Sequence, residues 1–189
     1  VFYYCDYLKS VTLSTNITSL PTYVVTYDDD PDELFGFFAN CSSLESIVIP
    51  EGVTTIGDKA FESCTSLKEI ILPNTVTNLG KAAFYSCSKL RSVTLSENIT
   101  SLQSAYYVAY WDEVYCVYGC FSACSSLESI TIPNSVTKVG RGVFYGCNAL
   151  KSVQLSNNIT SLLSTYDSSY NDYGFFENCS SLTSITLPD

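Results

Sequence analysis

Apolar positions in this chain recur in short, ordered bursts. The segment after Leu44 is typical: Ser46-Ile47-Val48-Ile49 alternates small polar and β-branched residues, and Pro50 then ends the burst. Such alternation favours a short strand with one buried face. Because every apolar burst is far shorter than a transmembrane helix requires, no membrane span is predicted.

Each burst belongs to a repeat that is marked by a cysteine. Seven of the nine Cys have a Phe three residues before them and a Leu three residues after them. They are Cys5, Cys41, Cys64, Cys87, Cys124, Cys147 and Cys179. The intervals between them are 36, 23, 23, 37, 23 and 32 residues. A fixed motif with a base period of 23 predicts one solenoid array over residues 1–189, with about seven units.

The short units suggest how one repeat is built. After the strand they carry VTTIG, VTNLG or VTKVG, where Gly57, Gly80 and Gly140 suit a positive φ or a tight backbone approach. KAF, AAF or GVF follows, and we expect a helical turn or one short helix there. The predicted fold class is an α/β repeat solenoid, with a short parallel β-sheet on one face and turns or short helices on the other.

The consensus C-x-x-L-x-x-I-x-[IL]-P-x-x-V-T-x-[IVL]-G-x-x-[AV]-F resembles the BspA-like class of leucine-rich repeats. The resemblance covers nearly the whole chain apart from three inserts. It implies a leucine-rich repeat solenoid from a surface-exposed or secreted protein. Such proteins are often adhesins, and they occur in bacteria and unicellular eukaryotes. The family has no shared catalytic site.

The repeated Cys has two interpretations. Stacked units would place these sulfurs roughly 5 Å apart, the spacing of neighbouring strands. They are then either buried free thiols in a core ladder, which we favour, or disulfides that would distort the ladder. The chain has no CxxC pair and no His, so no metal site is predicted at these residues.

Three long units replace the VTxIG turn with NITSL and add an insert, near residues 21–35, 103–119 and 163–174. Because all three leave their unit at the same point, we expect them on one edge of the solenoid. The inserts hold nine of the 19 acids and no Lys or Arg. They also hold ten of the 15 Tyr and the single Trp: Tyr23, Tyr27, Tyr106, Tyr107, Tyr110, Trp111, Tyr115, Tyr118, Tyr166, Tyr170 and Tyr173.

This composition makes the inserts a candidate binding or assembly surface, since repeat insertions often mark the binding face and Tyr-rich surfaces suit recognition. The alternative is that the inserts pack on one another and cover the sheet's flank.

The run Asp28–Glu33 is a candidate Ca²⁺ site, although a solvated acidic loop tip is the interpretation we favour. No other cofactor is predicted.

Two cysteines lie outside the ladder, at Cys116 and Cys120 of the second insert. In an oxidising compartment a local disulfide between them is the favoured hypothesis. The other interpretation is a pair of loop thiols.

Five Asn lie in N-x-[ST] sequons and are candidate N-glycosylation sites: Asn16, Asn40, Asn98, Asn158 and Asn178. Three occupy the equivalent turn of every long unit, and two directly precede a ladder Cys. N-linked glycans would imply a eukaryotic-type secretory route. The alternative is that Asn is simply favoured in these turns.

Charge and residue types narrow the function. A net charge of −10 argues against nucleic acid and anionic membranes as partners. Without His, Ser–His and Cys–His nucleophiles are unavailable, and the chain has neither a phosphate loop nor HExxH, so no enzyme and no catalytic residue are predicted.

Neither end of the chain resembles a polar cap, which predicts a piece of a longer array or end-to-end stacking through neighbouring repeats. The predicted function is therefore a non-enzymatic extracellular glycoprotein scaffold that forms a fibre or surface coat. The alternative is a cell-surface adhesin that binds a cell-surface protein or glycan through the Tyr-rich inserts.

Overall fold

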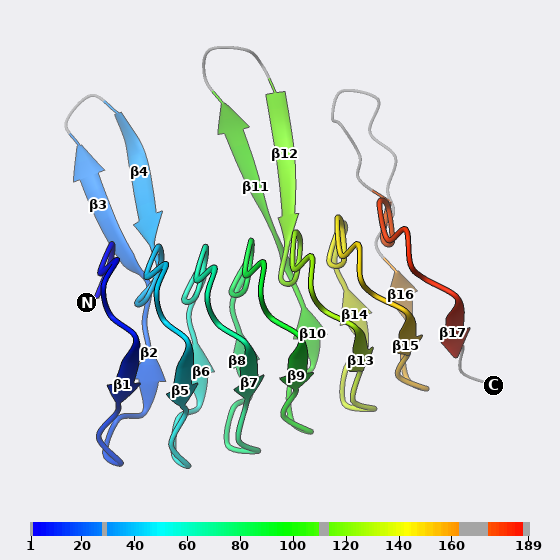
Figure 1. Cartoon of the computed structure of the whole chain (residues 1–189), viewed down its shortest axis with the longest axis horizontal. Helices are drawn as coiled ribbons and strands as arrows, with labels where there is room; N and C mark the ends of the chain where they lie inside the picture. The colour runs from blue at the N-terminus through cyan, green and yellow to red at the C-terminus, as the bar shows by residue number, and fades with distance from the viewer. Residues whose placement is uncertain (1, 28–29, 110–113, 163–173, 187–189) are drawn as a thin grey trace.

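The computed structural model describes residues 2–27, 30–109, 114–162 and 174–186, which form a solenoid of stacked units (Figure 1). Each unit contributes one three-residue strand to a first strand layer. These strands are β1 (Ser10–Thr12), β5 (Ser46–Val48), β7 (Glu69–Ile71), β9 (Ser92–Thr94), β13 (Ser129–Thr131), β15 (Ser152–Gln154) and β17 (Ser184–Thr186). They form three parallel groups, β1–β5, β7–β9 and β13–β15–β17, which pair between equivalent residues, so that Val11 faces Ile47 and Val153 faces Ile185.

A second strand layer runs behind the first, where the sequence predicted only a turn. Its strands have two residues each: β2 (Ser19–Leu20), β6 (Thr55–Ile56), β8 (Asn78–Leu79), β10 (Ser101–Leu102), β14 (Lys138–Val139) and β16 (Ser161–Leu162). They form two parallel groups, β2–β6–β8 and β10–β14–β16. In each of these strands, except β16, the second residue is apolar and points into the core. These residues are Leu20, Ile56, Leu79, Leu102 and Val139, and all are buried.

The third side of each unit consists of turns, and the predicted short helix is wrong. No helix occurs in the part of the chain that the structure describes. In residues 59–64, amide N–H groups alternate between two kinds of acceptor. The even-numbered amides bond to the carbonyl three residues earlier, and the odd-numbered amides donate at 2.8–2.9 Å to Lys81, Ala83 and Tyr85 of the next unit. Since an α-helix needs these N–H groups for its own i−4 carbonyls, stacking replaces the helix by turns.

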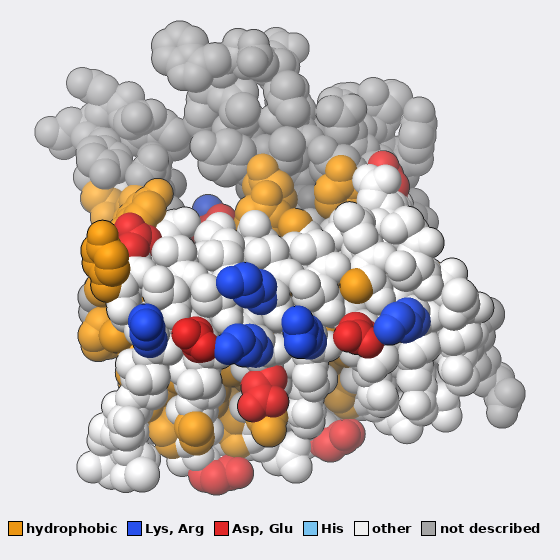
Figure 2. All heavy atoms as spheres, viewed as in Figure 1, with side chains coloured by type: hydrophobic (Ala, Val, Ile, Leu, Met, Phe, Trp, Pro, Cys, Tyr) orange, Lys and Arg blue, Asp and Glu red, His pale blue; other side chains and the backbone are white. Residues whose placement is uncertain are grey.

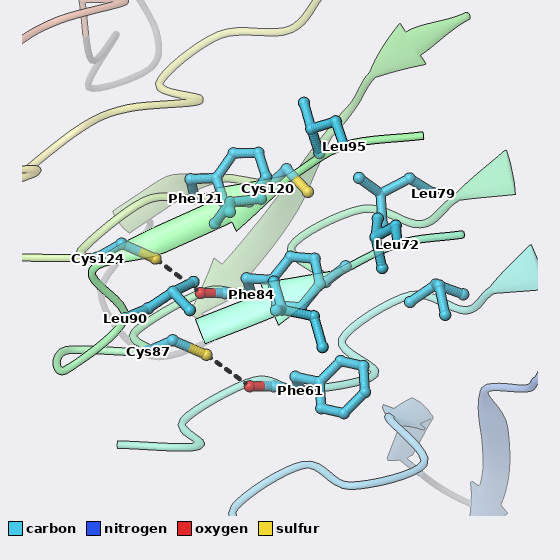
Figure 3. Packing of buried hydrophobic residues seen from close by; sticks show 14 of the residues in the cluster. Phe61, Leu72, Leu79, Phe84, Cys87, Leu90, Leu95, Cys120, Phe121 and Cys124 are labelled. Carbon is cyan, nitrogen blue, oxygen red and sulfur yellow. Dashed lines mark hydrogen bonds between the residues drawn. The ribbon is translucent and has the colours of Figure 1, made fainter. Parts of the chain in front are cut away.

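A column of phenylalanine rings fills the core behind these turns (Figure 3). The rings of Phe2, Phe38, Phe61, Phe84, Phe121, Phe144 and Phe176 stack in order, with centroid distances of 5.3–5.9 Å and interplanar angles of at most 15°. Phe61, Phe84 and Phe121 in the middle of the column are fully buried. Offset stacking at this spacing is a favourable arrangement of aromatic rings, and here it also sets the distance between units.

The ladder cysteines tie each unit to the previous one. Six of the seven thiols, all but that of Cys5, donate a hydrogen bond to the carbonyl of the ladder Phe one unit back, as Figure 3 shows for Cys87 and Cys124. The Sγ–O distances are 2.7 Å for Cys41, 3.2 Å for Cys64, 3.0 Å for Cys87, 3.2 Å for Cys124, 3.1 Å for Cys147 and 3.0 Å for Cys179. All seven ladder cysteines are free thiols, which confirms the favoured interpretation.

A donor thiol must keep its proton, and its surroundings favour the protonated form. Burial raises the pKa of Cys41 and of Cys179 to about 11, and it raises the pKa of Cys124 well above the ordinary value. The thiols at the middle of the ladder are therefore neutral, hydrogen-bonded core groups rather than reactive thiolates.

Glycine is required at the end of the second strand layer because neighbouring backbones touch there. A Cβ added at Gly80 would lie 2.3 Å from the carbonyl carbon of Gly57 in the preceding unit. Neither glycine has a positive φ. Of the two roles that the sequence left open, the tight backbone approach is therefore the one observed.

Removing one ring from the Phe column is predicted to destabilise the solenoid according to its place in the column. Phe84→Ala should lower the free energy of unfolding by about 3–5 kcal/mol, because it deletes a fully buried side chain. Phe2→Ala is the matched control and should lower it much less, since Phe2 is exposed. Urea denaturation followed by circular dichroism measures both, and equal losses would contradict the stacked-column account.

The thiol ladder predicts that stability falls at alkaline pH. Thiols of the unfolded chain ionise near their ordinary pKa of 9.0, whereas Cys41 and Cys179 in the folded chain keep their protons up to about pH 11. Their contribution is therefore fully present below pH 9.0 and is lost as the pH rises from there towards 11. Denaturation midpoints at about pH 8 and about pH 10.5 measure the loss.

The control is the double variant Cys41→Ser and Cys179→Ser, which keeps hydroxyl donors that do not titrate in this range. Its stability should depend less steeply on pH than that of the parent. The same dependence in both proteins would show that the two thiols do not contribute.

Candidate functional site

The first two inserts form antiparallel hairpins that project from the solenoid. In the first, β3 (Tyr23–Tyr27) pairs with β4 (Asp30–Phe35), with an irregularity in register after Val25. In the second, β11 (Ser104–Ala109) pairs with β12 (Val114–Gly119) without a break in register. The two hairpins continue from β2 and β10 and rise from the same edge of the solenoid (Figure 1). Equivalent departure points in the repeat therefore place both on that edge, with the units of β6 and β8 between them.

A glycine marks the point where each hairpin rejoins the solenoid. A Cβ at Gly36 would lie 1.8 Å from the carbonyl oxygen of Lys59, and a Cβ at Gly119 would lie 2.2 Å from the Cα of Val143. The returning strand thus contacts the next unit directly, and a side chain at this position would push the two units apart.

Aromatic contacts fasten the base of each hairpin to the turns. The ring of Phe35 lies 4.3 Å from that of Tyr3, and the ring of Tyr118 lies 4.2 Å from that of Tyr85. For Tyr118, packing against the scaffold is therefore the observed role. Sequence analysis missed Tyr3 and Tyr85 as anchors, although both occupy the position two residues before a ladder Cys.

Beyond its base, the first hairpin stands clear of the core. Tyr23, Val24 and Val25 are consecutive residues of β3, and they are 43%, 55% and 38% exposed. Because successive side chains of a strand point to opposite faces, both faces of this hairpin are open to solvent. Leu34 on the opposing strand is also exposed. The hairpin therefore offers apolar and aromatic side chains on a projecting ribbon.

The other candidate aromatic residues are placed only in part. Tyr27, Tyr106, Tyr107 and Tyr115 lie in hairpin strands, and Tyr110, Trp111, Tyr166, Tyr170 and Tyr173 lie outside the described residues. Of the candidate Ca²⁺ run, Asp28 and Asp29 also lie outside them, while Asp30 begins β4. Calcium binding there stays a prediction.

The predicted disulfide between Cys116 and Cys120 is not formed. Cys120 is a buried free thiol in the core, where its Sγ lies 3.9 Å from the carbonyl oxygen of Gly80. Cys116 lies in β12, three residues before the strand ends at Gly119. An extended strand advances about 3.3 Å per residue, so the two Cα atoms are separated by more than the roughly 7 Å that a disulfide spans. Four-residue spacing suggested a loop where the chain is in fact extended.

The sequon asparagines have structural roles. Asn16, Asn98 and Asn158 are exposed in the turn after a first-layer strand. The Nδ2 of Asn98 donates to the Asn74 carbonyl at 2.7 Å, and that of Asn158 donates to the Asn134 carbonyl at 2.8 Å. These bonds join neighbouring units, so Asn is favoured here with or without a glycan.

The other two sequons lie at a left-handed backbone position. Asn40 and Asn178 have φ of 60° and 62°, and Ser63, Ser86 and Ala123 at the equivalent position are also left-handed. Asn adopts this conformation more readily than most residues. Glycosylation of the five sites stays a prediction.

A row of basic and acidic side chains crosses the face shown in Figure 2. It includes ion pairs between neighbouring units, from Lys68 to Glu45 at 2.6 Å and from Lys151 to Glu128 at 2.8 Å. A hydrogen bond and the positive charge of Lys68 lower the pKa of the Glu45 carboxyl, and Lys151 lowers that of Glu128 in the same way. All four residues follow a ladder Leu, so the repeat brings opposite charges of neighbouring units together in these two pairs.

Comparison with known families agrees with this architecture. The family model described as "BspA type Leucine rich repeat region (6 copies)" matches residues 35–112 and 115–189. The chain belongs to the BspA-type leucine-rich repeat family. The resemblance inferred from the Cys–Leu–Phe consensus is thereby confirmed.

A solved structure of a leucine rich cell surface protein shows the same fold. A leucine rich cell surface protein from Faecalibacterium prausnitzii A2-165 matches with a TM-score of 0.58 and 24% identity. That match covers 79% of this chain and 43% of the other, so this chain spans less than half the length of that protein. The leucine-rich repeat protein of T. pallidum matches with a TM-score of 0.49 and 28% identity, over 77% and 69% of the two chains. No curated protein matches the chain.

In the ranges that the structure describes, no helix has the length and apolar character needed to cross a bilayer.

The bond between Asn158 and Asn134 yields a prediction about the sequon turns. Asn158→Asp replaces the Nδ2 donor with an oxygen that faces the Asn134 carbonyl, and should lower the free energy of unfolding by about 0.5–1.5 kcal/mol. The protein is made in a bacterial host without N-glycosylation, and denaturation midpoints are compared. Asn157→Asp adds the same charge at the neighbouring exposed position and should have little effect. Equal effects of the two variants would show that Asn158 has no structural role in the turn.

Proposed function

We propose that this chain is a non-enzymatic, extracellular or cell-surface binding module whose projecting hairpins contact a protein or glycan on another cell. The observation that carries the proposal is the exposure of both faces of β3, at Tyr23, Val24 and Val25. Exposed apolar and aromatic side chains on a ribbon outside the core are typical of a recognition surface.

The scaffold supports this role by holding the hairpins rigidly. An isolated two-stranded hairpin is only marginally stable in water. Here its base is held by an aromatic contact, such as Tyr85 with Tyr118, and by a backbone junction at Gly36 or Gly119. Tyr suits such a surface because a large contact area is obtained by ordering only two torsions.

Negative charge also bears on the class of partner. The chain has a net charge of −10, and the inserts contain acids but no Lys or Arg. Their field would attract a basic surface and repel nucleic acid and anionic lipid. A basic or neutral patch on a surface protein, or a neutral glycan, is the expected partner of the hairpins.

The exposed face of the first strand layer is the competing surface. Val48 on β5 and Ile71 on β7 are 78% and 63% exposed, and the two strands are neighbours. They form a smaller apolar patch among Ser and Thr side chains. Because this patch is flat and the hairpins project, we assign the main contact to the hairpins.

A scaffold role, in which glycosylated units stack end to end into a fibre or surface coat, stays a second proposal. It is supported by the constant register between units, with Ser10 opposite Ser46 and Ser152 opposite Ser184. A further unit in the same register would extend the strand layers in the same way. Sedimentation analysis of the same preparations tests it, since concentration-dependent assembly is expected only for stacking.

Replacing the inserts is predicted to abolish binding without unfolding the scaffold. In the variant, residues 21–35, 103–118 and 163–173 are each replaced by Gly-Asp, the pair that occupies positions 57 and 58 of a short unit. Binding is measured on a printed glycan array and on fixed epithelial cells, with circular dichroism as the folding check. The parent should bind, and the variant should lose at least about tenfold in apparent affinity.

The control is the double variant Val48→Ser and Ile71→Ser, which changes the flat patch and leaves the hairpins intact. It should bind as the parent does. If this variant loses binding while the insert replacement keeps it, the strand layer and not the hairpin edge is the contact surface. Absence of binding by the parent to every array and cell surface would overturn the proposal.

A further inference from the structure

A cavity of about 430 Å³ lies at the base of the β11–β12 hairpin, against the second strand layer. Its polar and charged lining consists of Lys81, Ser101, Gln103, Ser104, Lys138 and Arg141. Lys81 comes from the unit before the hairpin, and Lys138 and Arg141 come from the unit after it. Three successive units thus contribute to one hollow beside β10, the strand that continues into the hairpin.

The break in the second strand layer lies at this place. β8 pairs with β6, and β10 pairs with β14, but β8 and β10 are not paired with each other. The hairpin unit and the unit after it are in close contact beside the cavity, since a Cβ at Gly140 would lie 2.5 Å from the Oγ of Ser104.

The charge of the lining is opposite to that of the chain. Three of the nine Lys and Arg residues line this cavity, in a chain with 19 acids and a net charge of −10. No carboxylate belongs to the lining that the described residues form. Lys81 and Lys138 are the exposed cations of this lining, and both charges would stabilise an anionic group bound against it.

The base of the first hairpin provides an internal comparison with the same backbone. There the Thr22 hydroxyl donates to the carbonyl of Asp58, as the Ser104 hydroxyl donates to the carbonyl of Arg141. Yet the position of Arg141 is taken by Asp58, and that of Lys138 by Thr55. Since the fold is made equally well with an acid and a neutral residue, the cations are not required by the solenoid.

We propose that this cavity binds an acidic saccharide, a sugar that carries a carboxylate or a sulfate group. Lys81 and Lys138 are exposed, and their ammonium groups can make charge-assisted hydrogen bonds to the anionic group. The hydroxyl of Ser101 and the amide of Gln103, which lie 3.3 Å apart, are suited to the sugar hydroxyls. A volume of about 430 Å³ falls in the usual range of small-molecule sites and exceeds what one inorganic anion fills.

This site is separate from the apolar surface of the hairpins, and it does not depend on that surface contacting a cell. It also differs in the sign of its ligand's charge, because the acidic inserts favour basic or neutral partners. One chain would then hold an acidic glycan at the hairpin base and a second partner above it.

The test uses isothermal titration calorimetry on the full chain with three disaccharides. Digalacturonic acid carries carboxylates, a heparin-derived disaccharide carries sulfates as well, and cellobiose is neutral. At least one acidic disaccharide should bind and cellobiose should not. The double variant Lys81→Ser and Lys138→Ser should weaken binding by at least about tenfold, because two charge-assisted bonds are lost.

The matched control is Lys9→Ser with Lys89→Ser, which lowers the net charge equally at two exposed positions outside the cavity. It should bind the acidic disaccharide as the parent does. An equal loss in both double variants would show a general effect of charge and would overturn the site. Equal binding of cellobiose, or equal binding of inorganic phosphate, would overturn the assignment to an acidic sugar. The insert replacement also removes Gln103 and Ser104 of the cavity lining, so the two proposals are separated by the variant Lys81→Ser with Lys138→Ser, which leaves the hairpins intact.

Discussion

The hydrogen bond that joins a ladder thiol, from Cys41 onwards, to the Phe carbonyl one unit back is the interaction on which the rest of the solenoid depends. It joins units directly beside the stacked rings of Phe61, Phe84 and Phe121, so donor, acceptor and ring repeat together. The sulfur fits because it is small, apolar and still a donor. All other side chains must then pack at the distance of about 5 Å between neighbouring units that this column imposes. The close contact at Gly80 is one consequence, since a Cβ there would lie 2.3 Å from the carbonyl carbon of Gly57 in the preceding unit.

The same constraint decides where the chain tolerates insertions. In a short unit, only Gly57 and Asp58 separate the second-layer strand from the turns that lead to the next ladder Phe. In a long unit, a whole hairpin is inserted at the same place. The column is not interrupted, because the ring stacking of Phe84 on Phe121 is as close as that of Phe61 on Phe84. Insertions at this point therefore enlarge the surface without changing the core, which is the usual way that solenoids acquire binding edges.

Surface chemistry varies while the backbone stays constant. The residue that follows the second-layer glycine is Asp58 in one unit, Lys81 in the next and Arg141 in a third. The residues after the ladder Leu vary in the same way, and there the variation produces ion pairs such as Lys68 with Glu45. One scaffold can therefore place opposite charges at equivalent sites, so similar backbones in this family need not share ligands.

The sequence by itself determined the periodic core, the parallel strand register and the free thiols of Cys64 and Cys87. The reason is that stacking of units places each residue beside the equivalent residue of the next unit. It did not determine how the amide groups between residues 59 and 64 are shared, and so a helix was predicted where turns form. It also suggested a local disulfide at Cys120, whereas Cys116 lies in an extended hairpin strand and Cys120 is a free thiol in the core. The tertiary structure alone decided these points, together with the cavity at Lys81, Lys138 and Arg141, because each depends on contacts between units that are distant in the sequence.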